Sequence, residues 1–411
     1  MKRESIVGLD IGTTKICVVV GHLTDDDEIE IVAISTHPST GLRKGVVVNI
    51  DATVESIRRA VEEAQSLAKE EITRCFVGIA GSHIKSFNAQ GAVRVEGEEV
   101  SQGDVERALD AARAAVTIRA DREILHVIPR SYIVDDQDGV EKPVGMFGGR
   151  LEAEVHVVTG AVTSAQNLMK SCNRAGLDVA DIVLEPLASS EAVLTPEERE
   201  LGVALIDSGG GTTDLAIFYR GGVWYTSGLP LGGNSVTSDL SIGLRTPMAE
   251  AERIKQRHGC ARSTMVNEGE MIEVPSVGGR PPRELSRQIL AGIIEPRQKE
   301  IYALLREDIE RSGYSNFIAA GAVLTGGASC IEGAEQTAES VLQMPVRIGR
   351  PIGVTGLVEA TSNPSYATGV GLVLYGAKAS MQDAYFHPLE AGDGFLASLT
   401  ARMRSWFEKI F

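Results

Sequence analysis

Residues 203–218 read VALIDSGGGTTDLAIF, in which two apolar, largely β-branched runs flank a turn of glycines and threonines. Such runs joined by a glycine turn predict a β-hairpin. A second stretch near the start of the chain, IVGLDIGTTKICVVV at residues 6–20, repeats the plan with a shorter turn. In both, an aspartate ends the first run and a pair of threonines follows. The chain therefore contains two related hairpins, one near its start and one near its middle.

The turn of each hairpin is suited to binding phosphate. Glycines allow consecutive backbone N–H groups to approach an anion closely, and threonine hydroxyls add further donors. An aspartate at the strand end cannot face phosphates unshielded, so it implies an intervening cation, most naturally a hydrated Mg²⁺. We expect Asp10 and Asp207 to hold this metal ion from opposite sides. Either hairpin alone is also explained as an ordinary turn, and it is their combination that indicates a site.

A third segment, AVLTGGAS at residues 322–329, reads as a buried strand that ends in two glycines. Missing side chains at such a turn allow a base or ribose to approach closely, so this segment is expected to receive a nucleoside. Between the hairpins lies a charged helical stretch in which Glu252 and Lys255 share one face. We expect this pair to bond a ribose and an adenine edge, although the same pattern also fits an ordinary solvated face.

This combination resembles the actin, Hsp70 and sugar-kinase ATPase superfamily, in which two ribonuclease-H-like halves clamp ATP and Mg²⁺ between paired hairpins. The resemblance implies an α/β, two-lobed actin-like fold built from duplicated ribonuclease-H-like domains. The binding residues that it implies are Asp10, Gly12, Thr13, Thr14 and Lys15 in the first phosphate motif, Asp207, Gly209, Gly210, Gly211, Thr212 and Thr213 in the second, and Gly326 and Gly327 in the adenosine motif.

The resemblance also places two hinge helices, at residues 184–192 and 369–376. In relatives that hydrolyse ATP, a group near the position of Glu185 helps to place water and metal, which makes Glu185 the catalytic candidate. The same residue is equally explained as a helix-starting glutamate ahead of Pro186, where the helix dipole favours negative charge. Whether ATP is hydrolysed at more than a slow rate is left open.

The segment between residues 75 and 160 identifies the branch of the superfamily. Its phrases FVGIAGSHI at 76–84 and ILHVIPRSYIVD at 124–135 resemble the inserted small subdomain of the FtsA family of bacterial cell-division proteins. RHGCA at 257–261 and IEPR at 294–297 match that family too, so the resemblance covers essentially the whole chain. The subdomains expected from it are 1–84 with 161–196 and 356–379, an insert at 85–160, 197–235 with 301–355, a smaller part at 236–300, and a tether at 380–393.

Membership of that family would imply several partners. The chain would bind ATP, form actin-like filaments on the cytoplasmic face of the inner membrane at the division site, receive the tail of the tubulin-like protein FtsZ, and recruit later division proteins. Arg287 matches a partner-binding position, with Arg280 and Arg283 nearby as further candidates for an acidic tail. We expect Arg287→Glu to weaken binding of an FtsZ tail peptide and to leave ATP affinity intact, although surface arginines are often merely solvated.

Residues 394–411 form an amphipathic pattern when placed on a helical wheel. Cations border both edges of an apolar sector, which is typical of a helix lying in the lipid headgroup plane. The alternative is a terminal helix docked on the protein's own core, but a preceding stretch with Pro388, Gly392 and Gly394 reads as a tether. The expected membrane-binding residues are Phe395, Leu396, Leu399, Arg402, Met403, Arg404, Trp406, Phe407, Lys409 and Ile410.

Composition narrows the remaining possibilities. The formal net charge of −16 opposes binding to nucleic acid, and the five scattered cysteines indicate neither disulfides nor a zinc site. We expect neither a signal peptide nor a spanning helix. Other functions of the superfamily remain as alternatives: a small-molecule kinase, for which a clear substrate base is missing, a chaperone ATPase, which would need a large peptide-binding domain, and a pilus-assembly actin homologue.

Overall fold

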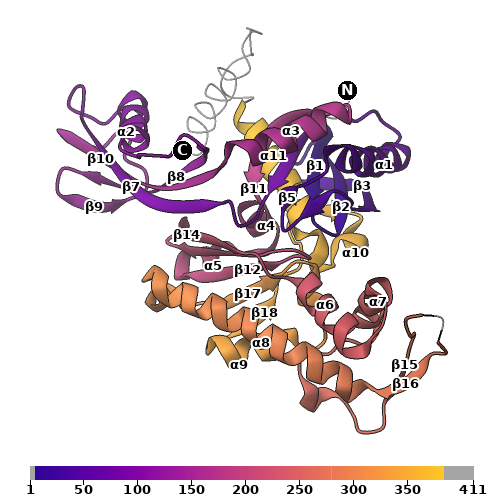
Figure 1. The fold of residues 1–411 in the computed structure, drawn as a ribbon. Coiled ribbons are helices and arrows are strands. Elements are labelled where there is room, and N and C mark those ends of the chain that lie inside the picture. The colour runs from indigo at the N-terminus through magenta and orange to yellow at the C-terminus, as the bar shows by residue number, and fades with distance from the viewer. Residues whose placement is uncertain (1–4, 279, 384–411) are drawn as a thin grey trace.

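Two β-sheets, one in each lobe, face each other across a pair of helices in the computed structural model, which describes residues 5–278 and 280–383 (Figure 1). The first lobe contains a six-stranded sheet of order β11-β6-β1-β2-β3-β19. Its strands are β1 Ser5–Ile11, β2 Lys15–Leu23, β3 Ile29–Pro38, β6 Arg74–Ile79, β11 Asp178–Leu184 and β19 Thr355–Gly356. A two-stranded piece, β4 Leu42–Arg43 with β5 Val46–Val47, lies beside it.

The second lobe repeats this hairpin plan in a five-stranded sheet of order β14-β13-β12-β17-β18. Its strands are β12 Val203–Ser208, β13 Thr213–Tyr219, β14 Gly222–Leu229, β17 Ala322–Thr325 and β18 Val346–Ile348. In both lobes the predicted hairpin is the antiparallel pair at the centre of the sheet: β1 with β2, and β12 with β13. The structure therefore confirms both hairpins.

Two helices, α4 (Glu185–Val193) and α11 (Ala367–Asp383), lie between the sheets and pack on each other. Their crossing is close, because a Cβ on Gly371 would lie 1.8 Å from the carbonyl oxygen of Ala188. Only glycine allows this approach. The outer face of the first sheet is covered by α1 (Ile50–Ala68) and α3 (Val162–Arg174). The helices expected at the hinge thus form the layer shared by the two lobes.

The outer side of the second lobe is covered by α8 (Arg287–Ser312) and α9 (Ala334–Leu342), whose apolar side chains join the sheet in one core. Helix α8 is continuous through residue 300, so the boundary expected there falls inside a helix. Its first turns belong to a smaller part of the lobe. That part contains α6 Gly233–Leu244, α7 Met248–His258, β15 Met271–Val274 and β16 Arg283–Ser286. A short segment, α5 (Pro196–Leu201), precedes β12, and α10 (Val358–Thr361) follows β19.

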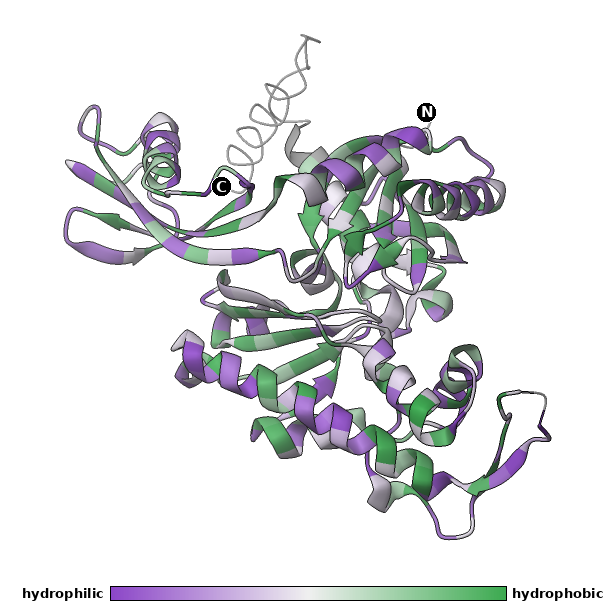
Figure 2. Cartoon of the chain, viewed as in Figure 1, coloured by the Kyte–Doolittle hydropathy of each residue, from purple (hydrophilic) through white to green (hydrophobic). Residues whose placement is uncertain are grey.

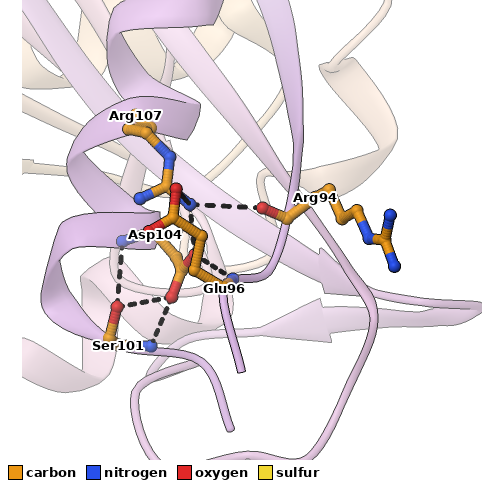
Figure 3. Close-up of polar contacts among 5 residues, drawn as sticks. All are labelled: Arg94, Glu96, Ser101, Asp104 and Arg107. Carbon is orange, nitrogen blue, oxygen red and sulfur yellow. Dashed lines mark hydrogen bonds and ion pairs between the residues drawn. The ribbon is translucent and has the colours of Figure 1, made fainter. Parts of the chain in front are cut away.

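The insert has its own sheet, of order β7-β10-β8-β9, and its own core against α2 (Gln102–Ala114). Its strands are β7 Lys85–Arg94, β8 Arg122–Val134, β9 Gln137–Val140 and β10 Arg150–Ala161. The start of α2 is held by Asp104, a fully buried carboxylate that accepts hydrogen bonds from the backbone of Glu96 and Ser101 at 2.9 and 2.8 Å (Figure 3). The Arg107 guanidinium, 2.5 Å away, pairs with its charge.

Apolar residues concentrate in the strands and at the layer between the sheets, and hydrophilic ones on outer helix faces (Figure 2). This distribution, with the duplicated hairpins, confirms the predicted α/β actin-like class. Within the described residues, no helix combines the length and the apolar character that crossing a bilayer requires. Residues 380–383 of the tether expected at 380–393 belong to α11, and the rest of it and the expected membrane helix at 394–411 lie outside the described residues.

Candidate functional site

The two glycine turns meet at the mouth of the cleft between the lobes. The loop of residues 12–14 joins β1 to β2, and the loop of residues 209–212 joins β12 to β13. A Cβ on Gly210 would lie 2.4 Å from Thr14 Cγ2, and one on Gly211 would lie 2.4 Å from Thr13 Oγ1. Because no larger residue fits at either position without displacing the opposite loop, the two turns require glycine for close approach.

Both loops line a cavity of about 490 Å³ between the lobes. The structure brings together in this cavity most of the residues expected from the sequence. They are Asp10, Gly12, Thr13, Thr14, Lys15, Glu185, Asp207, Gly209, Gly210, Gly211, Thr212, Glu252, Lys255, Gly326 and Gly327. Thr213 lies behind its loop instead, where its buried hydroxyl donates to the carbonyl oxygen of Leu231 at 2.9 Å.

The start of helix α6 holds the second loop through backbone hydrogen bonds, a contact that the sequence analysis did not predict. The backbone N–H of Gly233 donates to the Gly209 carbonyl at 3.0 Å, and that of Asn234 donates to Gly210 at 2.8 Å. These are N–H groups at the start of a helix, which lack partners inside the helix. The signal was present as the Gly-Gly-Asn turn at residues 232–234, directly before a helical stretch. Both residues also line the cavity.

The first loop is tied to the start of α11 through Lys15. Its Nζ donates to the carbonyl oxygen of Ser365 at 2.6 Å and lies 4.3 Å from the centre of the Tyr366 ring. One of the three N–H donors of the ammonium is used in this bond. On its other side the loop is held by Thr13, whose hydroxyl accepts a hydrogen bond from the backbone of Gly45 at 3.1 Å. The lysine thus holds a positive charge at the cavity wall.

Four carboxyl groups lie around the two glycine loops: three are buried aspartates, and one, Glu185, is partly buried. Burial raises the pKa of Asp10 to about 6, against the opposing effect of Lys15 and with a further contribution from Asp207. Burial also raises the pKa of Asp207, although hydrogen bonds from Ser189 and Thr368 oppose this. Carboxylates with raised pKa values in one cleft favour a bound cation, which would restore their charged forms.

Sequence reasoning missed the fourth of these groups. Asp214, which pairs with Asp207 across β12 and β13, is buried, and burial followed by the charge of Asp207 raises its pKa to about 7. Glu185, at the start of α4, has its pKa raised well above its usual value by burial and then by Asp10, Asp214 and Asp207. In the sequence Asp214 looks like one more residue of an apolar strand, so only the pairing register reveals its place.

No cluster of three or more histidine, cysteine, aspartate or glutamate side chains in residues 5–278 and 280–383 is placed to ligate a metal ion directly. A hydrated Mg²⁺ keeps several waters and takes phosphate oxygens as ligands, so it does not need such a cluster of side chains. Asp10 and Asp207, on facing strands at the cavity floor, are the groups that would orient such an ion.

Glu252 and Lys255 both line the cavity, but their hydrogen bonds are made largely with each other and with neighbouring helix residues. Lys255 is buried, and its ammonium donates to Gly233 O, Thr237 Oγ1 and Glu252 Oε2 at 3.1, 2.8 and 2.7 Å. All three of its donors are therefore used. Since Gly233 is at the start of α6, the lysine braces the helix that supports the second loop, and Glu252 is the member of the pair with acceptor capacity left for a ligand.

Two further expected residues have placements that the sequence did not indicate. Gly326 has a φ of +83°, and a Cβ there would lie 2.4 Å from Asp207 Oδ1, so this glycine packs against the carboxylate as well as lining the cavity. Arg287 also lines the cavity and is largely buried. Its guanidinium pairs with Glu270 at 2.8 Å and with Glu332, and it donates to His258 O.

Comparison with protein families gives two matches. Residues 204–371 match the model described as "Cell division protein FtsA", and residues 81–159 match that of the "SHS2 domain inserted in FTSA". The chain is 54% identical to the cell division protein FtsA of Pseudomonas aeruginosa over 99% of this chain and 98% of that protein. It is 41% identical to FtsA of Escherichia coli K12 over 100% of this chain and 99% of that protein.

Solved structures show the same fold at low sequence identity. The type IV pilus biogenesis complex PilM–PilN matches with a TM-score of 0.65 and 16% identity, over 91% of this chain and 99% of that one. MreB5 of Spiroplasma citri bound to ADP matches with a TM-score of 0.57 and 15% identity, over 93% of this chain and 99% of that one. These likenesses support the actin-like fold.

Proposed function

Because this chain belongs to the FtsA family of cell division proteins, we propose that it is an ATP-binding, actin-like protein that anchors the FtsZ ring to the membrane. In this proposal it polymerises on the cytoplasmic face of the inner membrane at the division site and helps to recruit later division proteins. The proposal that the chain binds ATP rests mainly on one observation: two loops of glycines and threonines meet at a cavity that Asp10 and Asp207 also line.

The proposed binding mode follows from the cavity wall. Backbone N–H groups of residues 12–14 and 210–212 and the ammonium of Lys15 would bind the phosphates, whereas the N–H of Gly209 already donates to the carbonyl oxygen of Thr212 at 2.9 Å. Asp10 and Asp207 would orient a hydrated Mg²⁺, which offsets phosphate charge when bound. Gly327 and Glu252, further along the cavity, would lie against the nucleoside. The loops touch in this structure, so binding is expected to move them apart.

We expect the protein to hydrolyse ATP slowly. The pKa of Glu185 is well above its usual value, because burial and three neighbouring carboxylates disfavour its charged form. A protonated carboxyl group cannot accept a proton from water, and it would become a base only where a bound cation restores its charge. We therefore propose Glu185 as a water-positioning group with weak activity as a base.

Cys330 offers a direct test of nucleotide binding. It is exposed and lines the cavity, whereas Cys17, Cys75, Cys172 and Cys260 are buried. Burial raises the pKa of the Cys330 thiol, so labelling is best followed somewhat above about pH 8.5, the usual thiol pKa, where a thiol reagent should label this one cysteine rapidly. ATP with Mg²⁺ at about a hundred times its dissociation constant should slow that labelling by about a hundredfold.

The control for this footprint is Cys330→Ser, which should remove the rapid phase altogether. Labelling of Cys330 at an unchanged rate in saturating ATP would count against a nucleotide in this cavity. AMP, which lacks the outer phosphates, should protect much less, because it reaches only one of the two loops.

Membrane attachment is proposed from residues 394–411. Eight large apolar side chains on one face, at about 1.5 to 3 kcal/mol each for full burial, can offset the ordering cost of one short helix. Trp406→Glu should abolish co-sedimentation with anionic liposomes and leave Cys330 protection by ATP unchanged. Ser405→Glu, which places the same charge on the neighbouring residue of the polar side, serves as the control. Persistent pelleting of the Trp406 variant would contradict the anchor.

The FtsZ tail is proposed to bind the smaller part of the second lobe. Ile242 on α6 and Ile289 on α8 are 74% and 49% exposed, on two helices that pack together, and the exposed Arg283 donates to the carbonyl oxygen of Leu244 at the end of α6. Apolar side chains bordered by cations suit a peptide with apolar and acidic residues. Arg287 also lines the cavity, so we expect Arg287→Glu to weaken ATP binding as well as binding of the tail peptide.

A cleaner test of the tail site is Ile289→Glu. It should weaken binding of an FtsZ tail peptide at least about tenfold, the equivalent of about 1.4 kcal/mol, in a fluorescence anisotropy titration. Leu201→Glu, at a residue that is 60% exposed on another face, should have no effect. If the two variants bind the peptide with equal affinity, the FtsZ tail does not bind at this face.

A further inference from the structure

The insert is connected by sequence to the first lobe, yet it also rests on the second. Strands β7 and β8 of the insert contact β14, the edge strand of the second-lobe sheet (Figure 1). The Ser86 hydroxyl donates to the carbonyl oxygen of Thr226 at 2.7 Å. The insert therefore contacts both lobes, which lie on either side of the proposed nucleotide cavity.

A buried histidine is at the centre of this contact. The His156 ring lies 2.8 Å from Asn88 Oδ1 through Nδ1 and 3.0 Å from Thr226 Oγ1 through Nε2. An amide oxygen only accepts, so Nδ1 donates and Nε2 accepts from the threonine hydroxyl. Burial, with the charge of Arg130, lowers the pKa of His156 to about 3, so the ring stays neutral at physiological pH. One ring nitrogen is thus held inside the insert by Asn88, and the other is bonded across the interface to Thr226 on β14.

An aromatic cluster completes the contact. The Arg130 guanidinium lies 3.8 Å from the ring centre of Trp224, and the rings of Tyr219, Tyr314 and Phe317 surround the same indole at 5.3, 5.5 and 6.1 Å between ring centres. Asn88 donates to the Tyr314 hydroxyl at 2.9 Å and so joins the aromatic and polar halves. We call this set of contacting residues the clasp; it consists of Ser86, Asn88, Arg130, His156, Tyr219, Trp224, Thr226, Tyr314 and Phe317.

The clasp is connected to the phosphate loop by one strand pair. β14 pairs with β13 from Thr213↔Leu229 to Tyr219↔Gly222, and β13 begins where the second loop ends. At that end Asp214 accepts a hydrogen bond from the backbone of Gly81, the residue that leads into the insert. A Cβ on Gly228 would lie only 3.3 Å from the Gly81 carbonyl oxygen. A movement of the second loop is therefore carried by β13 and β14 to the surface that holds the insert.

We propose that the clasp reports the state of the nucleotide cavity to the insert, so that separating the two phosphate loops rearranges the contacts of Trp224 with Arg130 and of His156 with Thr226. This rests on the proposed nucleotide binding. The loops are in contact at Thr14 and Gly210, and we expect a triphosphate that inserts between them to displace them. Coupling of this kind is reciprocal: weakening the clasp must change nucleotide affinity by the same factor by which nucleotide changes the clasp.

The chain contains two tryptophans, Trp224 and Trp406, so Trp406→Phe leaves the clasp indole as the sole tryptophan reporter. In that background, ATP with Mg²⁺ should change the emission of Trp224, and the midpoint of the change should equal that of Cys330 protection. Asn88→Ala, which removes the link between Tyr314 and His156, should reduce the emission change and shift the midpoint of protection by at least about fivefold. Gln90→Ala, on the same strand but bonded to Glu154 inside the insert, should do neither.

The outcomes separate this inference from the proposed function. If Cys330 is not protected by ATP, nucleotide binding itself fails. If Cys330 is protected while Trp224 emission is unchanged, or if Asn88→Ala and Gln90→Ala give the same ATP midpoint as the parent, the clasp is a static contact and the inference is wrong.

Discussion

Gly210→Val should reduce ATP affinity by about a hundredfold or more. A valine at this position would overlap Thr14, since even its Cβ would lie 2.4 Å from Thr14 Cγ2. Gly210 lines the cavity, so the valine side chain would occupy the space between the loops that the phosphates enter, and the phosphates would lose hydrogen bonds from at least one loop. Hydrogen bonds to a charged group contribute about 1.5 to 3 kcal/mol each, so losing two removes about 3 to 6 kcal/mol of binding free energy. Calorimetric titration with Mg²⁺ and ATP measures this directly.

The matched control is Gly292→Val. This glycine is exposed on α8 and a Cβ there meets no atom within 4 Å, so the same substitution adds bulk without contact. It should bind ATP like the parent. A Gly210→Val protein that is folded by circular dichroism and binds ATP normally would mean that the loops do not grip phosphate.

Asp104→Ala should destabilise the insert by at least about 1.5 to 3 kcal/mol, the usual contribution of a hydrogen bond to a charged group, because Arg107 is 39% exposed and is not left as a buried charge. The change leaves the backbone N–H groups of Glu96 and Ser101 without their acceptor and removes the partner of Arg107 (Figure 3). Hydrogen exchange should show the amides of α2 and the preceding loop exchanging much faster. Asp110→Ala, at an exposed position of the same helix, should cost about 0.5 kcal/mol or less.

The pH dependence of this network has a definite sign. Burial alone would raise the pKa of Asp104, but hydrogen bonds from Ser101, Glu96 and Arg107 outweigh it and lower the pKa to about 2. A carboxyl group with a lowered folded-state pKa contributes stability that is complete above its unfolded pKa of about 3.9 and is lost as pH falls toward 2. Exchange of α2 should therefore be independent of protonation of Asp104 between pH 5 and 8. A loss of protection in that window in the parent protein, absent from Asp104→Ala, would contradict this assignment.

The fold and most of the cavity were predictable because their signals are local. β-branched runs around glycine turns specify the hairpins at residues 6–20 and 203–218, and their repetition specifies two lobes. The glycines at 210 and 211 are required where the loops meet, so the residue type itself indicated the site.

The remaining features depend on pairing between segments distant in sequence. The pairing register of β12 and β13 places Asp214 beside the other carboxyl groups. The ammonium of Lys255 donates hydrogen bonds to residues of α6 and is therefore not free for a ligand. Arg287 looked like a surface cation and instead has carboxylate partners from two other segments. Likewise, the contact of Trp224 with the insert arises only when β14 meets β7 and β8.

The most direct test of the account is a crystal structure with a non-hydrolysable ATP analogue and Mg²⁺. The account predicts the triphosphate between residues 12–15 and 209–212, with a hydrated Mg²⁺ between it and the carboxylates of Asp10 and Asp207. A nucleotide bound elsewhere, or loops that remain in contact through Thr14 and Gly210 with the nucleotide present, would contradict it.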